Sequence, residues 1–255
     1  MLKHVAGLDH LVVLVHDLDA AAALWRGFGF TVSPRGEHSA HLKTANHTIM
    51  LPGDDYIELL AVTGVSPTNG RWRRRLAVSE GLAGAALRLS DARLAAEELG
   101  GFAVRDFGRP VTMPDGRVVE ARFSVFDVHD DAAPELRLFA CQHHTPEAVW
   151  VSNLLAHANA AQRILRIEQV AADPATVAAA LAAHLRGTPE SLADGYRVAT
   201  AAGRAAIEVM TPAAFAARHK GQATPAEGPA AIVLQADGQP REAVLNGVLV
   251  QLSNR

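Results

Sequence analysis

Two ionisable residues stand inside strand-like runs of apolar residues, where a chemical role would explain them better than packing. His10 lies in the run 8–15, and Glu58 lies in the run 55–60. In an extended strand each would share its face with apolar neighbours. Burying an ionisable group is costly unless it is paired or bound to a metal. We therefore expect both side chains to face one hollow, either as ligands of a metal ion or as a hydrogen-bonded pair, and exposure of one or both side chains is the remaining alternative.

Two adjacent histidines, His143 and His144, close a later strand-like run. Neighbouring residues of a strand point to opposite faces, so at most one of the two can share an ion with His10. The next residues, Thr145 and Pro146, are typical of a helix start, with threonine as the cap and proline in the first helical position. The segment therefore either supplies one ligand or is mainly structural.

The composition is that of a globular protein, with 49% hydrophobic and 20% charged residues. The 24 basic and 27 acidic residues give a net charge of −3, which is not the basic footprint of a nucleic-acid-binding protein. Cys141 is the only cysteine, so any metal must be held by His, Asp, Glu or Gln. No run approaches the roughly 20 apolar residues that cross a membrane, and residues 1–10 lack the apolar stretch of a secretory signal. We expect a cytoplasmic protein that binds neither nucleic acid nor membranes.

One pattern of elements occurs three times along the chain. Each copy consists of an apolar strand, an aspartate in the helix-cap position and an alanine-rich or amphipathic helix. The copies are 8–15 with Asp17 and 18–26, 82–89 with Asp91 and 92–99, and 163–171 with Asp173 and 175–186. This repetition predicts a fold built from similar units.

After each helix, β-like runs separated by turn residues complete the unit as a βαβββ element. One such unit cannot bury both faces of its small sheet, so units must pair. The sequence predicts an α+β fold in which βαβββ units pair into curved, cup-shaped mixed sheets with helices on the outside. Units one and two would form a domain at 1–147. The third unit and a fourth that has lost its helix would form a degenerate second domain at 148–255.

Several of these segments resemble a known superfamily. Residues 7–18, GLDHLVVLVHDL, resemble the opening strand and helix cap of the vicinal oxygen chelate superfamily, which includes glyoxalase I, extradiol dioxygenases and bleomycin-resistance proteins. Residues 55–60, DYIELL, resemble its metal-bearing fourth strand. Together with 142–147, QHHTPE, and 207–210, IEVM, they are most similar to the branch of glyoxalase-like domain proteins.

The resemblance implies a divalent metal on the concave sheet face, held by one residue of the first strand and one of the fourth strand of each unit. In the first unit His10 and Glu58 match these positions. In the second unit the first-strand position holds Gly84, which has no side chain to offer. The fourth-strand position falls within 141–143, where either Gln142 or His143 faces the metal.

The third ligand would decide the chemistry. With His143 the set has the two-histidine, one-carboxylate composition that suits Fe(II), although it also fits Zn or Mn. With Gln142 the oxygen ligands favour Zn, Ni, Mn or Mg and proton transfer, in which Glu58 could act as the catalytic base. The side chains expected to line the substrate pocket are Val12, His47, Tyr56 and Gln142, with a surface position as the alternative for His47.

Two functions are consistent with these features. The first is a metal-dependent enzyme of lyase, isomerase or dioxygenase type that acts on a small oxygenated substrate. The second is a metal-free protein that binds or sequesters a small molecule, as bleomycin-resistance proteins do, and Gly84 favours it. The degenerate second half would serve packing or the formation of a homodimer.

Two charged features lie outside this candidate site. The run 71–75 contains four arginines and a tryptophan, and we expect it to be a solvated linker between units one and two. In the third unit Arg166 takes the place of His10, and Glu208 takes the place of Glu58. Because an arginine does not bind a cation, we expect a buried ion pair there rather than a second metal site.

Overall fold

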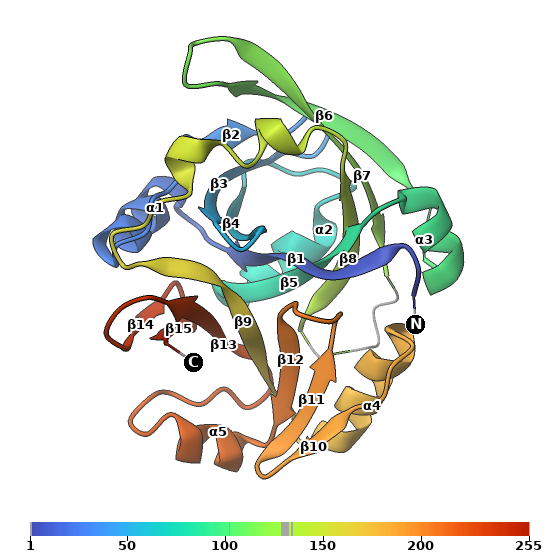
Figure 1. The fold of residues 1–255 in the computed structure, drawn as a ribbon, viewed down its shortest axis with the longest axis vertical. Helices are drawn as coiled ribbons and strands as arrows, with labels where there is room; N and C mark the ends of the chain where they lie inside the picture. The colour runs from blue at the N-terminus through green and yellow to red at the C-terminus, as the bar shows by residue number, and fades with distance from the viewer. Residues whose placement is uncertain (1, 102, 129–132, 134, 255) are drawn as a thin grey trace.

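The computed structural model describes residues 2–101, 103–128, 133 and 135–254. The strands of this part of the chain form two curved sheets, one above the other in Figure 1. The first sheet has the order β2-β3-β4-β1-β5-β8-β7-β6, and the second has the order β10-β11-β12-β9-β13-β15-β14. The first sheet consists of β1 (Val5–Leu14), β2 (Gly36–Glu37), β3 (Thr44–Leu51), β4 (Asp55–Val62), β5 (Gly81–Leu89), β6 (Arg105–Thr112), β7 (Val118–Asp127) and β8 (Arg137–His143). The second consists of β9 (Ala161–Val170), β10 (Glu190–Leu192), β11 (Gly195–Ala199), β12 (Ala206–Met210), β13 (Gly228–Ala236), β14 (Arg241–Leu245) and β15 (Val248–Ser253).

Three of the five helices that the structure describes lie where the sequence predicts them, and their aspartate caps are confirmed. Asp17 accepts the backbone N–H groups of Asp19 and Ala20, and Asp91 and Asp173 cap their helices in the same way. The helices are α1 (Leu18–Gly27), α2 (Gly70–Leu76), α3 (Ala92–Leu99), α4 (Pro174–His184) and α5 (Pro212–Arg218), with short 3₁₀ turns at Pro146–Ala148 and Ser152–Leu154. No helix in the described ranges is long and apolar enough to span a membrane.

The repeat predicted from the sequence is present in both sheets. In the first sheet β1 runs parallel to β4 and antiparallel to β5, and β5 in turn runs parallel to β8. In the second sheet β9 has the same relation to β12 and β13, and β13 runs parallel to β15. Two βαβββ units therefore pair in the first sheet, and a third unit pairs with a shortened fourth in the second. The α+β fold of cup-shaped mixed sheets is confirmed, whereas the division into domains 1–147 and 148–255 stays a prediction.

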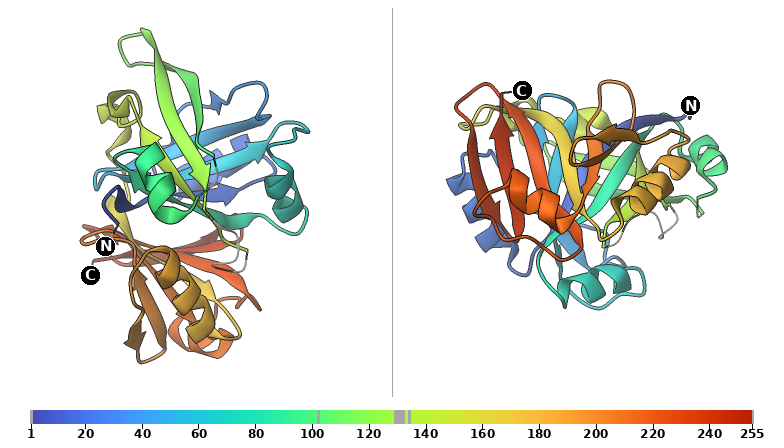
Figure 2. Two further views of the ribbon diagram at one scale, coloured as in Figure 1. Left: turned by 90° about the vertical axis from the view of Figure 1, so that its right-hand side faces the viewer. Right: turned by 90° about the horizontal axis from the view of Figure 1, so that it is seen from below.

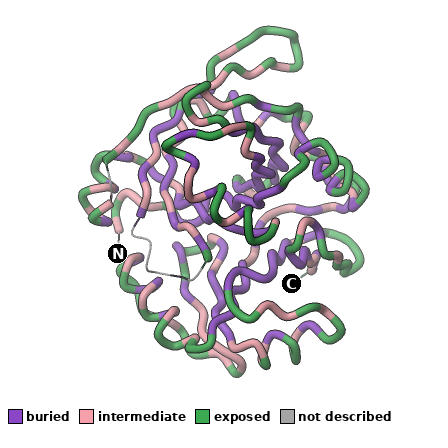
Figure 3. Tube along the Cα trace, turned by 180° about the vertical axis from the view of Figure 1, so that it is seen from behind, coloured by how far each residue is buried: buried purple, intermediate pink, exposed green. Residues whose placement is uncertain are grey.

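The convex faces of the two sheets share one hydrophobic core. Leu11 of β1, Ile57 of β4, Ile167 of β9 and Ile232 of β13 are fully buried in it. Each such side chain contributes about 1.5–3 kcal/mol to stability. Figure 3 shows the buried segments in the central strands and the exposed ones in the loops and in the protruding β6–β7 hairpin. The two concave faces consequently point away from each other.

Each central strand contains a β-bulge at an equivalent position. On β1, Leu8 pairs with Leu87 and His10 pairs with Ala86, so that Asp9 is the extra residue. The equivalent extra residues are Ala83 on β5, Leu165 on β9 and Ala230 on β13. A bulge breaks the alternation of side chains and re-aims the residues next to it. Asp9 therefore reaches the same neighbourhood as His10, which strict alternation along a strand does not predict.

Two short helices pack on the concave faces. Trp72 of α2 lies against Val12 and Leu60 in the first cup, and Phe215 of α5 lies against Met210 and Leu249 in the second. Figure 2 shows α5 lying across the second sheet. The expectation that 71–75 is a solvated linker is wrong, because these residues form most of α2 and the Trp72 side chain anchors that helix in the cup.

Candidate functional site

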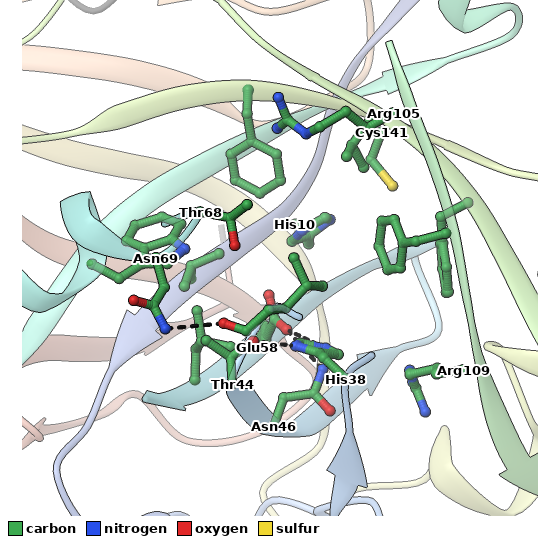
Figure 4. A pocket seen from close by; sticks show the side chains of 18 of the residues that line it. His10, His38, Thr44, Asn46, Glu58, Thr68, Asn69, Arg105, Arg109 and Cys141 are labelled. Atoms are coloured by element: carbon green, nitrogen blue, oxygen red, sulfur yellow. Dashed lines mark hydrogen bonds and ion pairs between the residues drawn. The ribbon is translucent and has the colours of Figure 1, made fainter. Parts of the chain in front are cut away.

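A cavity of about 280 Å³ lies in the concave face of the first sheet (Figure 4). It is lined by side chains of β1, β3, β4, β6, β7 and β8, and α2 covers part of it. Its walls are largely aromatic. The five aromatic side chains are Tyr56, Trp72, Phe107, Phe123 and Phe139. Such a cavity suits a small molecule with an apolar body and a few polar groups.

His10 reaches this cavity from β1, and its orientation is fixed on both sides. Its Nδ1 lies 2.6 Å from the Asp9 carboxylate, which leaves Nε2 for the cavity. The ring stacks on Tyr56 with centroids 4.3 Å apart and meets the edge of Phe139 at 5.3 Å. A carboxylate on one imidazole nitrogen fixes the tautomer and the orientation of the ring.

Asp9 is fully buried and binds three side chains. Its Oδ2 also lies 2.8 Å from Nε2 of His143, and its Oδ1 accepts a 2.8 Å hydrogen bond from Nε of Arg88. Burial alone would raise the pKa of this carboxyl, but the charge of His143 and the hydrogen bonds from His10 and His143 hold the pKa far below its usual range. Arg88 continues outward to the carboxylate and the backbone carbonyl of Asp54. The buried charge is therefore compensated within the protein.

Glu58 lines another part of the same cavity, from β4. Its Oε1 accepts a 2.7 Å hydrogen bond from the side-chain amide of Asn46 and lies 3.6 Å from Nε2 of His38. His38 is itself oriented by Thr44, whose hydroxyl lies 2.8 Å from Nδ1. Burial is the main cause that lowers the pKa of His38, and the charge of Arg109 also lowers it. The charge of Glu58 raises this pKa but does not cancel the lowering. Glu58 thus faces the cavity beside a neutral imidazole.

Three arginines line the cavity, and two of them share one aspartate. Arg105 lies 3.0 Å and Arg137 lies 2.7 Å from the carboxylate of Asp127. These charges hold the pKa of Asp127 below its usual value, although burial alone would raise it. Arg137 also lies over the Trp72 ring at 4.6 Å, an arrangement that favours the cation.

The structure brings together four of the residues that the sequence singled out. His10, Val12, Tyr56 and Glu58 all line the cavity. His143 does not line it, but lies behind His10 through their common bond to Asp9.

The other two expected pocket residues, Gln142 and His47, lie elsewhere. The Gln142 side chain accepts the backbone N–H of Ala92 and donates to the carbonyl of Ser90, at the start of α3. Nδ1 of His47 lies 2.7 Å from the carbonyl oxygen of Ser33, and Nε2 lies 3.8 Å from Asp19 of α1. His47 alternates with Asn46 and Thr48, which do line the cavity.

The second unit offers no donors at the positions that match His10 and Glu58. Gly84 holds the first position, and a Cβ built there would lie 2.9 Å from the Trp72 ring and 3.3 Å from Cβ of Val12. In the first unit Val12, two residues after His10, pairs with Glu58. In the second unit Ala86, two residues after Gly84, pairs with Phe139. The second position therefore holds Phe139 rather than Gln142 or His143. Only half of the fourfold ligand arrangement that the resemblance implies is therefore present in these strands.

The remaining donors still fit a divalent ion by their chemistry. Asp9, His10 and His143 each offer one ligand atom, and these atoms lie within 4.8 Å of one another. Imidazole nitrogen and carboxylate oxygen are ligands of Zn²⁺, Mn²⁺ and Fe²⁺. Arg88 already occupies the Asp9 carboxylate, however, and neither Asp9 nor His143 lines the cavity. Of the four candidate ligands Asp9, His10, Glu58 and His143, only His10 and Glu58 line the cavity.

The second cup has a different interior. The expected ion pair is confirmed, with Nε of Arg166 3.4 Å from Glu208. Arg218 of α5 adds bonds of 2.6 Å to Glu208 and 2.8 Å to Glu168, and His219 lies 2.5 Å from Glu168. Helix α5 and this closed set of charges fill the cup.

Cup-shaped sheets of paired βαβββ units around a cavity define the vicinal oxygen chelate superfamily. The family described as "Glyoxalase-like domain" matches residues 8–185, so the chain belongs to this family. No curated protein matches the sequence.

Similar solved structures support the fold over nearly the whole chain. A hypothetical protein from Staphylococcus aureus is 9% identical with a TM-score of 0.71, and the match covers 96% of this chain and 98% of that one. The Mn(II)-bound glyoxalase from Novosphingobium aromaticivorans is 10% identical with a TM-score of 0.55, and the match covers 98% of this chain and 82% of that one. At these identities the likeness concerns the fold alone.

Proposed function

We propose that the first cup is the active site of a metal-dependent enzyme that moves a proton on a small oxygenated substrate, as isomerases and lyases do. The observation that carries this proposal is that His10 and Glu58, the two ionisable residues expected to meet, line one cavity. Proton transfer is favoured over oxygen chemistry because Nε2 of His143 is bound to Asp9 rather than directed into the cavity. The similarity to a Mn(II)-bound glyoxalase is consistent with this class of reaction.

The ion would be held by His10 and Glu58, and Zn, Fe, Mn, Ni and Mg remain the candidates. When bound, it supplies Lewis-acid polarisation of a substrate oxygen. The alternative position is the group Asp9, His10 and His143. His10 is common to both positions, whereas Glu58 belongs to the first and His143 to the second.

The protein's own side chains divide the remaining tasks. Asp9 fixes the His10 ring so that Nε2 faces the cavity. Asn46 holds Oε1 of Glu58, so Oε2 is the oxygen that would hold the ion and, once the substrate displaces it, take a proton from the substrate. The aromatic walls bind the apolar part of the substrate and exclude water from the reacting groups.

A calorimetric titration with Mn²⁺ tests this proposal on wild type, Glu58→Gln and His143→Ala. We expect about one ion per chain in wild type, loss of the ion in Glu58→Gln and its retention in His143→Ala. The reverse pattern would move the ion to the group around Asp9 and remove Glu58 as a ligand. Failure of the wild type to bind Mn²⁺, Zn²⁺, Ni²⁺, Mg²⁺ or Fe²⁺ would contradict the proposal.

One observation favours a second candidate function, a metal-free protein that binds a small molecule. The second unit contributes Gly84 and Phe139 where two further ligands would be expected, and Trp72 occupies the space beside Gly84. Such a protein would gain thermal stability on binding an apolar ligand and would show no turnover. The absence of ion binding together with such a stabilisation would establish this second function.

A further inference from the structure

The cavity wall carries a guanidinium group that has no acidic partner in the described part of the chain. Arg109 of β6 lines the cavity, and no hydrogen bond or ion pair joins it to any described residue. We propose that Arg109 binds the carboxylate of the substrate, so that the substrate class is a small monocarboxylic acid with an apolar, aromatic-sized body. This inference deepens the proposed function because it concerns the same cavity.

The neighbouring charges make Arg109 the unbalanced cation. The other two lining arginines, Arg105 and Arg137, neutralise Asp127. Asp106 is bound by Arg93 at 3.0 Å and by the hydroxyl of Ser124 at 2.5 Å. An anion that enters the cavity therefore meets one unsatisfied positive group, and a half-buried guanidinium without a partner is costly until such an anion binds.

Arg109 lies close to the reacting groups. Arg109 and His38 both line the cavity, and Nε2 of His38 lies 3.6 Å from Glu58. Figure 4 shows Arg109, His38 and Glu58 on the same side of the cavity. A carboxylate on Arg109 would thus lie on the same side of the cavity as Glu58.

Gly36 of β2 makes room for this arrangement. A Cβ built on Gly36 would lie 2.7 Å from Oδ1 of Asn46 and 3.1 Å from Nη1 of Arg109. Any larger residue would push apart the amide that orients Glu58 and the guanidinium that is free to bind the acid. The guanidinium fork matches the two oxygens of a carboxylate, which a point charge such as an ammonium does not.

The rest of the wall selects what is attached to the carboxylate. Phe107 and Phe123 stack with centroids 5.1 Å apart, and Phe139 and Tyr56 flank His10. A volume of about 280 Å³ suits a molecule with one ring or a branched aliphatic chain. A free aromatic monocarboxylate combines the anion that Arg109 needs with the body that these rings contact.

Calorimetry with phenylacetate and its neutral analogue phenylacetamide tests the proposal, because the two compounds share their shape and differ in charge. We expect wild type to bind the acid at least about tenfold more tightly than the amide. In Arg109→Gln this ratio should fall to near one. In the matched control Arg105→Gln, which alters an arginine that already has a partner, the ratio should be retained.

Two further variants guard against a merely structural effect. Arg109→Lys keeps the charge but loses the fork, so a reduced preference for the acid that still exceeds one is expected. Gly36→Ala should weaken phenylacetate binding more than phenylacetamide binding. Equal affinities of wild type for both compounds, or no binding of either at about 10 mM, would overturn the proposal. An equal loss of preference in Arg105→Gln and Arg109→Gln would overturn it as well.

A Mn²⁺ titration of Arg109→Gln separates this inference from the proposed function. Retention of the ion with loss of the acid preference supports both. Absence of ion binding in wild type together with a clear acid preference would leave the carboxylate anchor standing and contradict only the metal-dependent enzyme.

Discussion

The two cups of this protein share one backbone design and differ in what fills them. Both central strands carry the same bulge, at Asp9 in β1 and at Leu165 in β9. In the first cup His10 and Glu58 face an open cavity, whereas in the second Arg166 and Glu208 at the equivalent positions bind each other, and Glu208 also binds Arg218 of α5. The fold alone therefore does not make a site.

The difference between the cups lies in how the charges are satisfied. Glu168 and Glu208 in the second cup each have at least two basic partners from the chain itself. In the first cup Glu58 has only an amide and an imidazole, and Arg109 has no described partner. A closed set of charges stabilises the protein, and an open one leaves capacity for a ligand.

The largest effect we predict concerns the joint between the cups. Asp55 of β4 accepts the backbone N–H of Ile164 in β9 at 3.1 Å, and burial raises the pKa of its carboxyl to about 7. Because the pKa of Asp55 is raised in the folded state, the contribution of this carboxyl to the stability of the fold is complete below pH 4 and is lost as the pH rises through 7. The loss amounts to about 4 kcal/mol for this group.

Urea unfolding of wild type and Asp55→Asn between pH 4 and pH 8 checks this prediction. The amide of the variant does not titrate, so only the wild type loses stability through this position as the pH rises. The free energy of unfolding of the variant should therefore increase relative to that of wild type by about 4 kcal/mol between pH 4 and pH 8. If the difference in free energy of unfolding between the two proteins does not change with pH, Asp55 is not protonated in the folded protein. The two cups would then be coupled by apolar contacts alone.

A smaller effect distinguishes the paired charges of the second cup from those of the first cup, which are left available for a ligand. Burial would raise the pKa of Glu168, but His219 and then Arg218 and Arg166 lower it to about 2. The folded-state pKa is depressed, so this stabilisation is present above about pH 4.5 and is lost as the pH falls toward 2. Glu168→Gln should cost about 3 kcal/mol at pH 7 and much less at pH 2.5.

The matched change in the first cup is Glu58→Gln, measured in the same unfolding experiment. It should cost less than about 1 kcal/mol, because Asn46 can still donate to the new amide oxygen and no guanidinium loses its partner. Equal costs for the two changes would remove the distinction between a structural and a functional set of charges.

A further effect concerns the helix over the first cup. Gly84→Ala adds a Cβ 2.9 Å from the Trp72 ring, so α2 must shift at a cost of about 1–3 kcal/mol. Gly27→Ala is the control, because nothing lies within 4 Å of a Cβ built there. We expect a change in tryptophan fluorescence and a lowered melting temperature in Gly84→Ala only, and identical behaviour of both variants would show that Trp72 does not depend on Gly84.

The repeating architecture could be predicted because it is written in local patterns. Apolar strand runs, aspartate caps and alanine-rich helices mark each unit, and these signals do not depend on distant contacts. His10 and Glu58 could be predicted for a similar reason, as charges in apolar strands. The Arg166–Glu208 pair followed from placing the third unit over the first.

The rest of the site depends on features that no local pattern records. The bulge that brings Asp9 to His10 shifts the register by one residue, and its only sign in the sequence is an acid within an apolar run. His38 reaches the cavity from the position directly after the two-residue strand β2, and Arg109 reaches it from the protruding β6–β7 hairpin. The helix at 71–75 could not be predicted because four arginines surround Trp72, the side chain that anchors it in the cup.

The most direct test of a functional first cup and a structural second one is the number of divalent ions bound per chain. We propose to measure Mn²⁺ binding in wild type and in two variants at equivalent positions, His10→Ala and Arg166→Ala. The account predicts one ion per chain in wild type and in Arg166→Ala, and none in His10→Ala. Equal ion content in His10→Ala and wild type, or none in wild type, would contradict it.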